Sequence, residues 1–395
     1  KVAQMMATIP DLLPPEYADE LQKLQADAPP MGAGFVRRRM QAELGPDFLS
    51  RFRSFDFQPA AAASLGQVHR ATALDGAPLA CKLQYPDMAS AVEADLGQLD
   101  VLFSLHRRLN PVIDTREIVK EIGERVREEL DYAREARHAA LYAEILGDAP
   151  DVRVPPVRPE LSTARLLTLG WLDGAPLLDF RGAPQETRAR IASALFHAWW
   201  VPFARFGVIH GDPHLGNYAV FGADAARREA LGVNLLDYGC VRIFRPEFVD
   251  GVKTLYKSLL HDDFDGAFFA YERWGFRGLT RELAEILNIW ARFIFAPLLD
   301  DRVRTIADGV SPGRYGRKEA FRVHQALKEK GPVLVPREFV FMDRAAIGLG
   351  GAFLHLDARL NFHRLFEAAI GDFALEALRP RQRDALARAG LAAPP

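Results

Sequence analysis

The chain has 395 residues, of which 49% are hydrophobic and 26% are charged, and its formal net charge is −2 at pH 7. This length suits one large or two to three ordinary domains with a substantial core. The near-neutral charge argues against a dedicated nucleic-acid-binding protein, which would carry a basic excess on one face. Cys81 and Cys240 stand in apolar strand contexts, which favours free thiols in a reducing compartment over a disulfide framework.

Two helices are expected near the start of the chain. The first opens at Pro14-Pro15 and ends before Pro29-Pro30, and the second covers about 36–44. We therefore predict an N-terminal helical extension over residues 1–54. Because the chain begins at Lys1 without an initiator Met, we also expect a leading segment, with any targeting signal, to precede it.

An alanine-rich stretch, residues 59–66, precedes two apolar runs that are separated by Asp75-Gly76, a strong hairpin signal. The second run places Lys82 on a strand, and the compact ammonium of lysine suits phosphate binding. Alanine is the best helix former, but the position of the stretch favours a loop that faces a ligand. Its candidate ligand contacts are Ala61, Ala62, Ala63, Ser64 and Gly66.

A long helix is predicted from Asp114, which forms a capping box with Glu117. Asp131 and Glu135 are four residues apart on it and so share a face. The alternative for this acidic stretch is a solvated, salt-bridged surface. Apolar residues at four-residue spacing predict that another face meets a core: Ile118, Ile122, Val126 and Leu130.

The strongest chemical signal is His210-Gly211-Asp212-Pro213-His214-Leu215-Gly216-Asn217, followed by Asp237-Tyr238-Gly239. Protein kinases place a catalytic Asp, a metal-binding Asn and a second metal-binding Asp in this order. Short strands at 218–221 and 233–236 predict a hairpin that brings Asn217 and Asp237 together. Because carboxylate and amide oxygens suit Mg²⁺, the pattern predicts ATP and Mg²⁺ as cofactors.

Three roles follow from this pattern. Asn217 and Asp237 hold the metal, while Asp212 orients the nucleophile or accepts its proton. An alternative in which His210 and His214 join Asp212 as ligands of a transition metal is less favoured, because a histidine in such a loop is more often a structural group.

Residues 165–174 predict a strand that enters a turn, at the position where a kinase hinge contacts adenine. Thr168 to Trp171 would offer backbone donors and acceptors there, with Thr168 and Trp171 as candidate ATP contacts. An apolar core strand is the alternative for this segment.

Taken together, these patterns resemble the UbiB/AarF family of atypical, protein-kinase-like ATPases, and the resemblance spans nearly the whole chain. The residues that carry it are 9–17 (IPDLLPPEY), 61–71 (AAASLGQVHRA), 81–86 (CKLQYP), 129–132 (ELDY), 210–217 (HGDPHLGN), 342–344 (MDR) and 349–351 (LGG).

The resemblance implies an ATPase that supports biosynthesis of ubiquinone or a related isoprenoid lipid, and an ion pair between Lys82 and the catalytic residue Glu135. A Lys-x-Gly-Gln motif of the family is thought to hinder protein substrates, and Lys1 and Gln4 match it here, although Ala3 replaces the glycine. A Glu-x-Asp motif is matched by Glu129 and Asp131. We expect these four residues to be regulatory.

The predicted fold is α+β, a bilobal protein-kinase-like fold with the N-terminal extension and a mostly helical C-lobe. The domains are expected at 1–54, 55–170 for the N-lobe and 171–395 for the C-lobe. Three functions stay open: the lipid-supporting ATPase, a true protein or small-molecule kinase, and a catalytically weak ATP-binding scaffold. The candidate partners are ATP and membrane lipid or quinone-biosynthesis proteins, with no nucleic acid.

No apolar run is long enough to span a bilayer, and the nearest, 191–209, contains His197 and Arg205. We predict that it is a buried helix that leads into the catalytic motif. The expected location is the cytoplasm, with at most a peripheral association with a membrane.

Overall fold

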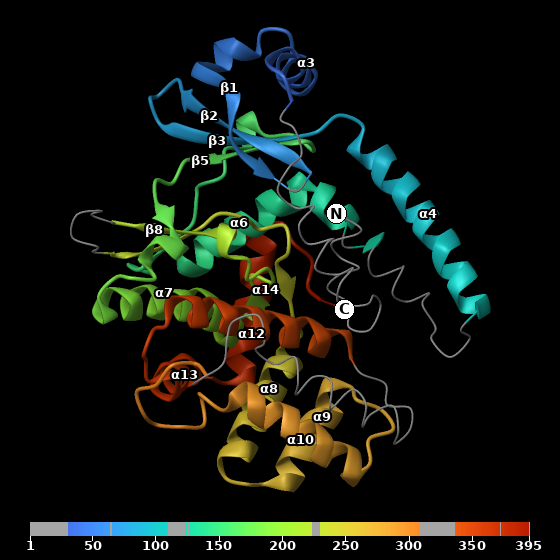
Figure 1. Cartoon of the computed structure of the whole chain (residues 1–395), viewed down its shortest axis with the longest axis vertical. Coiled ribbons are helices and arrows are strands. Elements are labelled where there is room, and N and C mark those ends of the chain that lie inside the picture. The colour runs from blue at the N-terminus through green and yellow to red at the C-terminus, as the bar shows by residue number, and fades with distance from the viewer. Residues whose placement is uncertain are drawn as a thin grey trace. The chain divides into compact units, whose positions relative to one another are not determined.

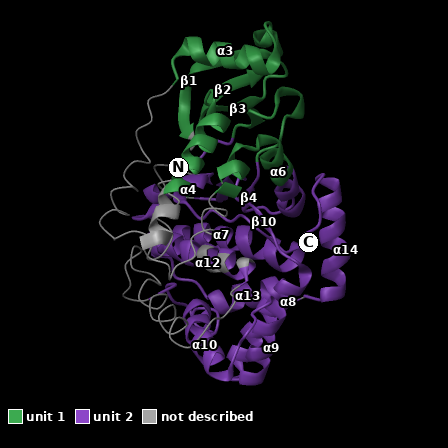
Figure 2. Cartoon of the chain, turned by 90° about the vertical axis from the view of Figure 1, so that its right-hand side faces the viewer, with its two compact units in different colours: residues 1–139, 155–171 green, residues 140–154, 172–395 purple. Residues whose placement is uncertain are grey.

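The computed structural model forms two compact units, one from residues 1–139 and 155–171 and the other from residues 140–154 and 172–395 (Figure 2). The residues that the structure describes are 31–63, 65–109, 123–124, 126–222, 230–307, 336–371 and 373–394.

The first unit is built on a four-stranded antiparallel sheet with the strand order β1-β2-β3-β5 (Figure 1). The turn at Asp75-Gly76 joins β2 to β3 as predicted, and Val68 on β2 faces Lys82 on β3. Gly76 has φ 90°, a value that glycine adopts at little cost, which explains its place in the turn. The strands are β1 (Phe52–Ala63), β2 (Gly66–Ala73), β3 (Pro78–Gln84) and β5 (Leu166–Gly170).

Helix α3 (Ala33–Leu44) contributes to the core of this sheet through Val36, Met40 and Leu44, which recur every four residues. The short helix η1 (Phe48–Arg51) adds Phe48 to the same hydrophobic cluster. The described part of the predicted extension therefore shares a core with the sheet, and the predicted boundary at 54/55 falls inside β1.

The long helix predicted from Asp114 differs in the structure. Residues 110–122 lie outside the described part, and the chain leaves the helical conformation at Asp131. The Asp131 carboxylate caps the next helix, α6 (Tyr132–Leu146), by accepting the Arg134 N–H at 2.8 Å. The prediction of one continuous helix was therefore wrong at Asp131, while the Glu135 N–H still donates to the Asp131 carbonyl at 3.0 Å, one helical turn away. The described part of this unit also contains the helices α4 (Met88–Leu109) and η2 (Pro159–Leu161).

The second unit holds two small sheets, one of order β4-β9-β8-β6 and one that pairs β7 with β10. The predicted hairpin is present, since β8 and β9 pair antiparallel with Tyr218 opposite Leu235. The strands are β4 (Val152–Arg153), β6 (Ala175–Pro176), β7 (Val208–Ile209), β8 (Tyr218–Phe221), β9 (Gly232–Leu235) and β10 (Arg242–Ile243).

Helices make up most of the second unit. Helix α7 (Gln185–Phe206) is largely buried and leads into β7, as predicted for 191–209, and Gly207 ends it in the left-handed conformation at φ 65°. The others are η3 (Leu177–Phe180), η4 (Leu215–Asn217), α8 (Pro246–Leu260), α9 (Phe264–Trp274), α10 (Arg281–Phe295), α12 (Arg337–Leu356), α13 (Phe362–Ile370) and α14 (Leu375–Arg388). Over the described ranges, no helix combines the length and apolarity that crossing a membrane requires.

Helix α14 carries a buried glutamine, Gln382, which is 4% exposed. Its Nε2 donates to the carbonyl of Phe206 at 2.7 Å and to that of Phe244 at 2.8 Å. Phe206 ends α7, so one of the carbonyls that a helix end leaves without a partner is satisfied from the C-terminal helix.

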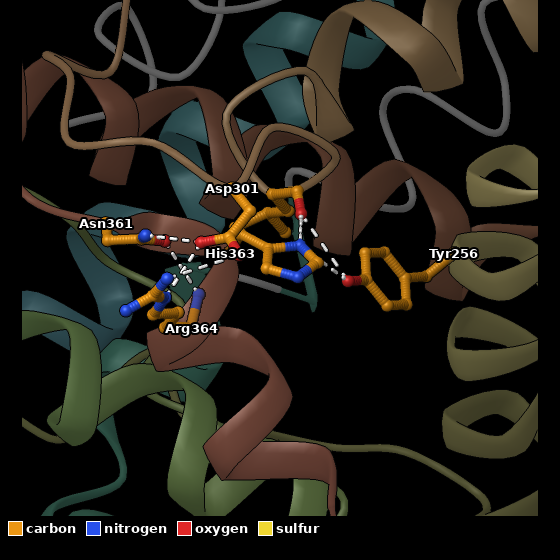
Figure 3. A network of polar contacts seen from close by, with 6 residues as sticks. Tyr256, Asp301, Asn361, His363 and Arg364 are labelled. Atoms are coloured by element: carbon orange, nitrogen blue, oxygen red, sulfur yellow. Dashed lines mark hydrogen bonds and ion pairs between the residues drawn. The ribbon is translucent and has the colours of Figure 1, made fainter.

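Two neighbouring polar clusters fix α13 to the segment that follows α10 (Figure 3). The His363 ring donates from Nδ1 to the Leu298 carbonyl at 2.8 Å, and the Tyr256 hydroxyl lies 3.2 Å from the same nitrogen. Asp301 accepts from Asn361 and Arg364, at 2.6 and 2.8 Å, and these bonds hold the pKa of its carboxyl below the usual range.

Candidate active site

Lys82 and Glu135 form a short ion pair in the first unit. The Lys82 Nζ lies 2.7 Å from Oε1 and 2.9 Å from Oε2 of Glu135, whose side chain is 2% exposed. The Lys82 ammonium also lies 5.2 Å from the centre of the Tyr132 ring. The pair that the resemblance implies is thus present, and it holds the lysine on β3 to α6.

The alanine-rich stretch is strand rather than loop. Residues up to Ala63 belong to β1 and pair with β2, so that Ala61 faces Val68 and Ala62 faces Gln67. The expectation of an open loop over 59–66 is therefore corrected, and Ser64 lies outside the described residues. Pairing with β2 supplies the backbone hydrogen bonds, which overrides the helical preference of alanine.

Gly66 packs closely on the strand that bears the lysine. A Cβ at this position would lie 2.3 Å from the Leu83 carbonyl oxygen, which real Cβ atoms do not approach so closely. The glycine is therefore required by the backbone spacing of β2 and β3, beside Lys82.

We expect Gly66→Ala to displace β3 and to lower the free energy of unfolding by about 1–3 kcal/mol, as overpacking does. Thermal unfolding and ATP binding measure the two consequences. Gly97→Ala on α4 is the matched control, because a Cβ there meets no atom within 4 Å. Unchanged melting and ATP affinity in Gly66→Ala would contradict the requirement for glycine.

The two predicted hinge residues have their backbone N–H groups engaged within the fold. The Thr168 N–H donates to the Ser162 hydroxyl at 3.0 Å, and its carbonyl accepts from Arg158 at 2.9 Å. The Trp171 N–H donates to the Pro78 carbonyl at 2.9 Å. Thr168 is also fully buried, so the alternative of a core strand describes it better than an adenine contact does.

Thr168 also faces Cys81 in the sheet. Burial raises the pKa of the Cys81 thiol to about 12, against the hydrogen bond from Thr168. This cysteine is therefore an unreactive packing residue, in keeping with a free thiol.

In the second unit, the loop that follows β7 orients Asp212 through both carboxylate oxygens. Oδ1 accepts the His214 N–H at 3.1 Å, and Oδ2 accepts from Nδ2 of Asn217 at 2.8 Å. The Asn217 amide nitrogen is thereby fixed, which turns its oxygen, the atom that can bind a hard cation, away from Asp212.

The same loop meets the segment around Asp237. The Leu236 N–H donates to the Asn217 carbonyl at 3.0 Å, so the end of the β8–β9 hairpin holds Asn217 beside the residue that precedes Asp237. Asp237 Oδ1 accepts the Gly239 N–H at 3.0 Å, which fixes its carboxylate. Asp212, Asn217 and Asp237 thus lie on one connected set of hydrogen-bonded loops.

Gly211 brings these loops into direct backbone contact. It has φ 79°, and a Cβ there would lie 2.0 Å from the Cys240 carbonyl oxygen. Both the left-handed conformation and the close approach require glycine. This contact sets the spacing between the Asp212 loop and the Asp237 loop.

His210 is a structural group. Its Nδ1 lies 3.2 Å from the Asp212 carbonyl, which can only accept, so Nδ1 carries the proton. Burial lowers its pKa, against the charges of Asp212 and Asp237, and the imidazole is neutral at pH 7. The ring is packed among four aromatic rings: Tyr142, Trp199, Tyr218 and Tyr238.

This packing disfavours the transition-metal alternative. His210 is 1% exposed within these rings, and the Nδ1 lone pair of His214 is used to cap η4 by accepting the Gly216 N–H at 3.1 Å. Across the described ranges, no three or more His, Cys, Asp and Glu side chains form a group that could hold a metal ion. The candidate ligands from the sequence, the Asn217 amide oxygen and the Asp237 carboxylate, are hard oxygen donors, which fit Mg²⁺.

Asn234 on β9 is a further polar residue of this region that the sequence analysis did not identify. It is fully buried, and its Nδ2 donates to the Asp173 carbonyl at 3.1 Å, which anchors the segment after the predicted hinge to β9. An asparagine in an otherwise apolar strand is the signal that could have pointed to it.

The predicted regulatory residues are only partly described. Lys1 and Gln4 lie outside the described residues. Glu129 lies on the helical turn before α6, and Asp131 caps α6 as described above.

Comparison with known proteins assigns the family. A model described as the ABC1 atypical kinase-like domain matches residues 23–269. The chain is 26% identical to the chloroplastic protein ACTIVITY OF BC1 COMPLEX KINASE 8 of Arabidopsis thaliana, over 97% of this chain and 52% of that protein. It is 31% identical to AarF domain-containing protein kinase 1 of Mus musculus, over 67% of this chain and 51% of that protein.

It is also 30% identical to the mitochondrial atypical kinase COQ8B of Rattus norvegicus, over 67% of this chain and 49% of that protein. The chain spans about half the length of these curated relatives. A solved structure, the complex of Rv3197 with erythromycin from Mycobacterium tuberculosis, is similar with a TM-score of 0.68 and 26% identity, over 94% of this chain and 91% of that one. Since the family model covers more than half of its residues, this chain belongs to the ABC1 atypical kinase-like family and has that kinase-like fold.

Proposed function

We propose that this protein binds ATP with Mg²⁺ and hydrolyses it, in support of the biosynthesis of ubiquinone or a related isoprenoid lipid. The observation that carries the proposal is that Asp212, Asn217 and Asp237, in the order that phosphoryl-transfer enzymes use, lie on loops that hydrogen bonds join to one another. The lipid connection rests on the UbiB/AarF resemblance and on the relationship to COQ8B. Membrane lipid and quinone-biosynthesis proteins are accordingly the proposed partners.

Each residue has one proposed role. Asn217 and Asp237 would hold Mg²⁺, which supplies charge neutralisation on the phosphates. Asp212, whose carboxylate is fixed by Asn217 and by the His214 N–H, orients the attacking water or accepts its proton. Lys82, oriented by Glu135, would contact phosphate oxygens. Lys1, Gln4, Glu129 and Asp131 stay proposed as regulatory.

The first test is Mg²⁺-dependent ATP hydrolysis by the purified chain. We expect Asp237→Asn and Lys82→Ala to lower the hydrolysis rate by about 100-fold or more, because each removes a charge that stabilises the transition state. Asp148→Asn and Lys257→Ala are matched controls at exposed positions. Equal rates in Asp237→Asn and Asp148→Asn would contradict the proposal.

The lipid role is tested by adding vesicles that contain anionic lipid, with and without a phenolic quinone-precursor analogue. Turnover that either addition raises supports the ATPase with this partner class. ATP consumption only in the presence of a defined acceptor would favour a true kinase, and nucleotide binding without turnover under all these conditions would favour a scaffold.

A further inference from the structure

Helix α12 packs against the loop that carries Asp212, and the contact leaves no room for a side chain at Gly348. A Cβ on Gly348 would lie 2.1 Å from Cγ of Pro213 and 3.0 Å from its Cβ. Pro213 directly follows Asp212 in the chain. Because the pyrrolidine ring is tied to the backbone, it cannot swing aside as a flexible side chain would. Any added atom at Gly348 must therefore move either α12 or the loop.

The same helix also contacts the segment that follows Asp237. The ring of Phe341 lies 5.1 Å from the Arg242 guanidinium, and Glu338 forms an ion pair with Arg245 at 3.3 Å. The Arg242 side chain in turn lies 3.6 Å from the position that a Cβ of Gly211 would take. Helix α12 thus contacts both of the segments that meet at Gly211 and Cys240, one through Pro213 and the other through Arg242 and Arg245.

Glycine destabilises a helix when it stands in the interior, as Gly348 does. In a helix interior it is less favourable than alanine and than every other residue except proline. Gly348 lies in the interior of α12, so neither a turn nor a helix end accounts for it. Gly351, three residues further on, meets no atom within 4 Å of its would-be Cβ, so the steric requirement at Gly348 is not shared by Gly351.

We infer that Gly348 is a positioning residue, through which α12 sets the place of Pro213 and hence of Asp212. Nothing in the family match assigns this role, because α12 lies beyond the matched residues 23–269. The inference rests on the proposed function, since Asp212 is given its catalytic role there.

A shift of Asp212 changes its alignment with the nucleophile. Lys82, proposed to contact phosphate, lies on β3. Asn217, although it is bonded to Asp212, keeps a second anchor in the Leu236 N–H, which donates to its carbonyl at 3.0 Å.

The test compares Gly348→Ala with Gly351→Ala, which makes the same substitution in the same helix without a contact. We expect Gly348→Ala to lower kcat for ATP hydrolysis by about 10-fold to 100-fold with KM for ATP changed less than about twofold, since misplacement by about 1 Å has effects of this size. Gly351→Ala is expected to keep the wild-type kcat. Equal kcat in the two variants, or a Gly348→Ala effect confined to KM, overturns the inference.

Pro213→Ala tests whether the loss passes through the ring, because it removes Cγ, the atom 2.1 Å from a Cβ at position 348, together with Cδ, and leaves only Cβ at 3.0 Å. In the Pro213→Ala background we expect Gly348→Ala to cause little further loss of kcat. An undiminished loss in that background contradicts a role through Pro213.

A readout that needs no turnover separates this inference from the proposed function. In amide NMR spectra, Gly348→Ala is expected to shift the Asp212 and His214 signals, and Gly351→Ala is expected to leave them in place. If the wild type hydrolyses no ATP, the proposed function fails, and unshifted Asp212 and His214 signals in Gly348→Ala would overturn the positioning role by themselves.

Discussion

Gly211→Ala is expected to lower ATP turnover by about 100-fold or more, the size of effect that a misplacement of about 1 Å produces. The new Cβ would meet the Cys240 carbonyl oxygen at 2.0 Å, and alanine at φ 79° is strained even with space around it. The two loops must separate, which moves Asp212 away from Asp237. Steady-state hydrolysis and thermal unfolding measure the loss of alignment and of stability.

Gly216→Ala in the same loop is the control for this substitution. Its Cβ would approach only the His214 ring, at 3.1 Å, and Gly216 is exposed. We expect it to fold like the wild type and to keep most of the turnover. Comparable losses in both alanine variants would show that the loop is merely intolerant of substitution.

Glu135→Ala is the second substitution with a large expected effect. It leaves Lys82, whose side chain is 15% exposed, without the carboxylate that lies 2.7 Å from its ammonium. Removing one partner of a buried ion pair typically lowers the free energy of unfolding by about 3–5 kcal/mol. Chemical denaturation gives this loss, and ATP binding is expected to weaken because Lys82 is no longer oriented.

A double variant separates stability from function at this pair. Lys82→Met with Glu135→Gln removes both charges at similar volume, so we expect it to be more stable than Glu135→Ala while it stays inactive. Recovery of ATP hydrolysis in the double variant would disprove the proposed role of Lys82.

The two hairpins could be predicted from the sequence, because the residues that specify each of them are close together in the chain. Asp75-Gly76 between two apolar runs specifies the β2–β3 turn, and the strands around the 223–229 connection specify the β8–β9 pair. These hairpins place Lys82 on its strand and Asn217 beside the Asp237 segment. The pairing of Lys82 with Glu135 came from the family resemblance, since 53 residues separate the two.

The predictions that the structure corrected failed for physical reasons that a local sequence pattern does not reveal. The alanine stretch became strand because β2 offers it backbone partners, and Asp131 ended a helix because its carboxylate satisfies the Arg134 N–H. The engagement of the Thr168 backbone depends on Ser162 and Arg158, which belong to a separate turn. The contact of Gly211 with Cys240 needs the three-dimensional path of two loops, and a glycine in a sequence does not reveal what it approaches.

The two hydrogen bonds of Gln382 tie the C-terminal helix to two segments that lie far from it in the sequence. Phe206 and Phe244, whose carbonyls it joins, stand just before and just after the stretch that contains Asp212, Asn217 and Asp237. The family match ends at residue 269, so a fragment cut to that match would lose the clasp between the two ends of this stretch, although every proposed metal and catalytic residue would still be present. The family match thus leaves out a helix that ties together the two ends of the stretch that carries the proposed site.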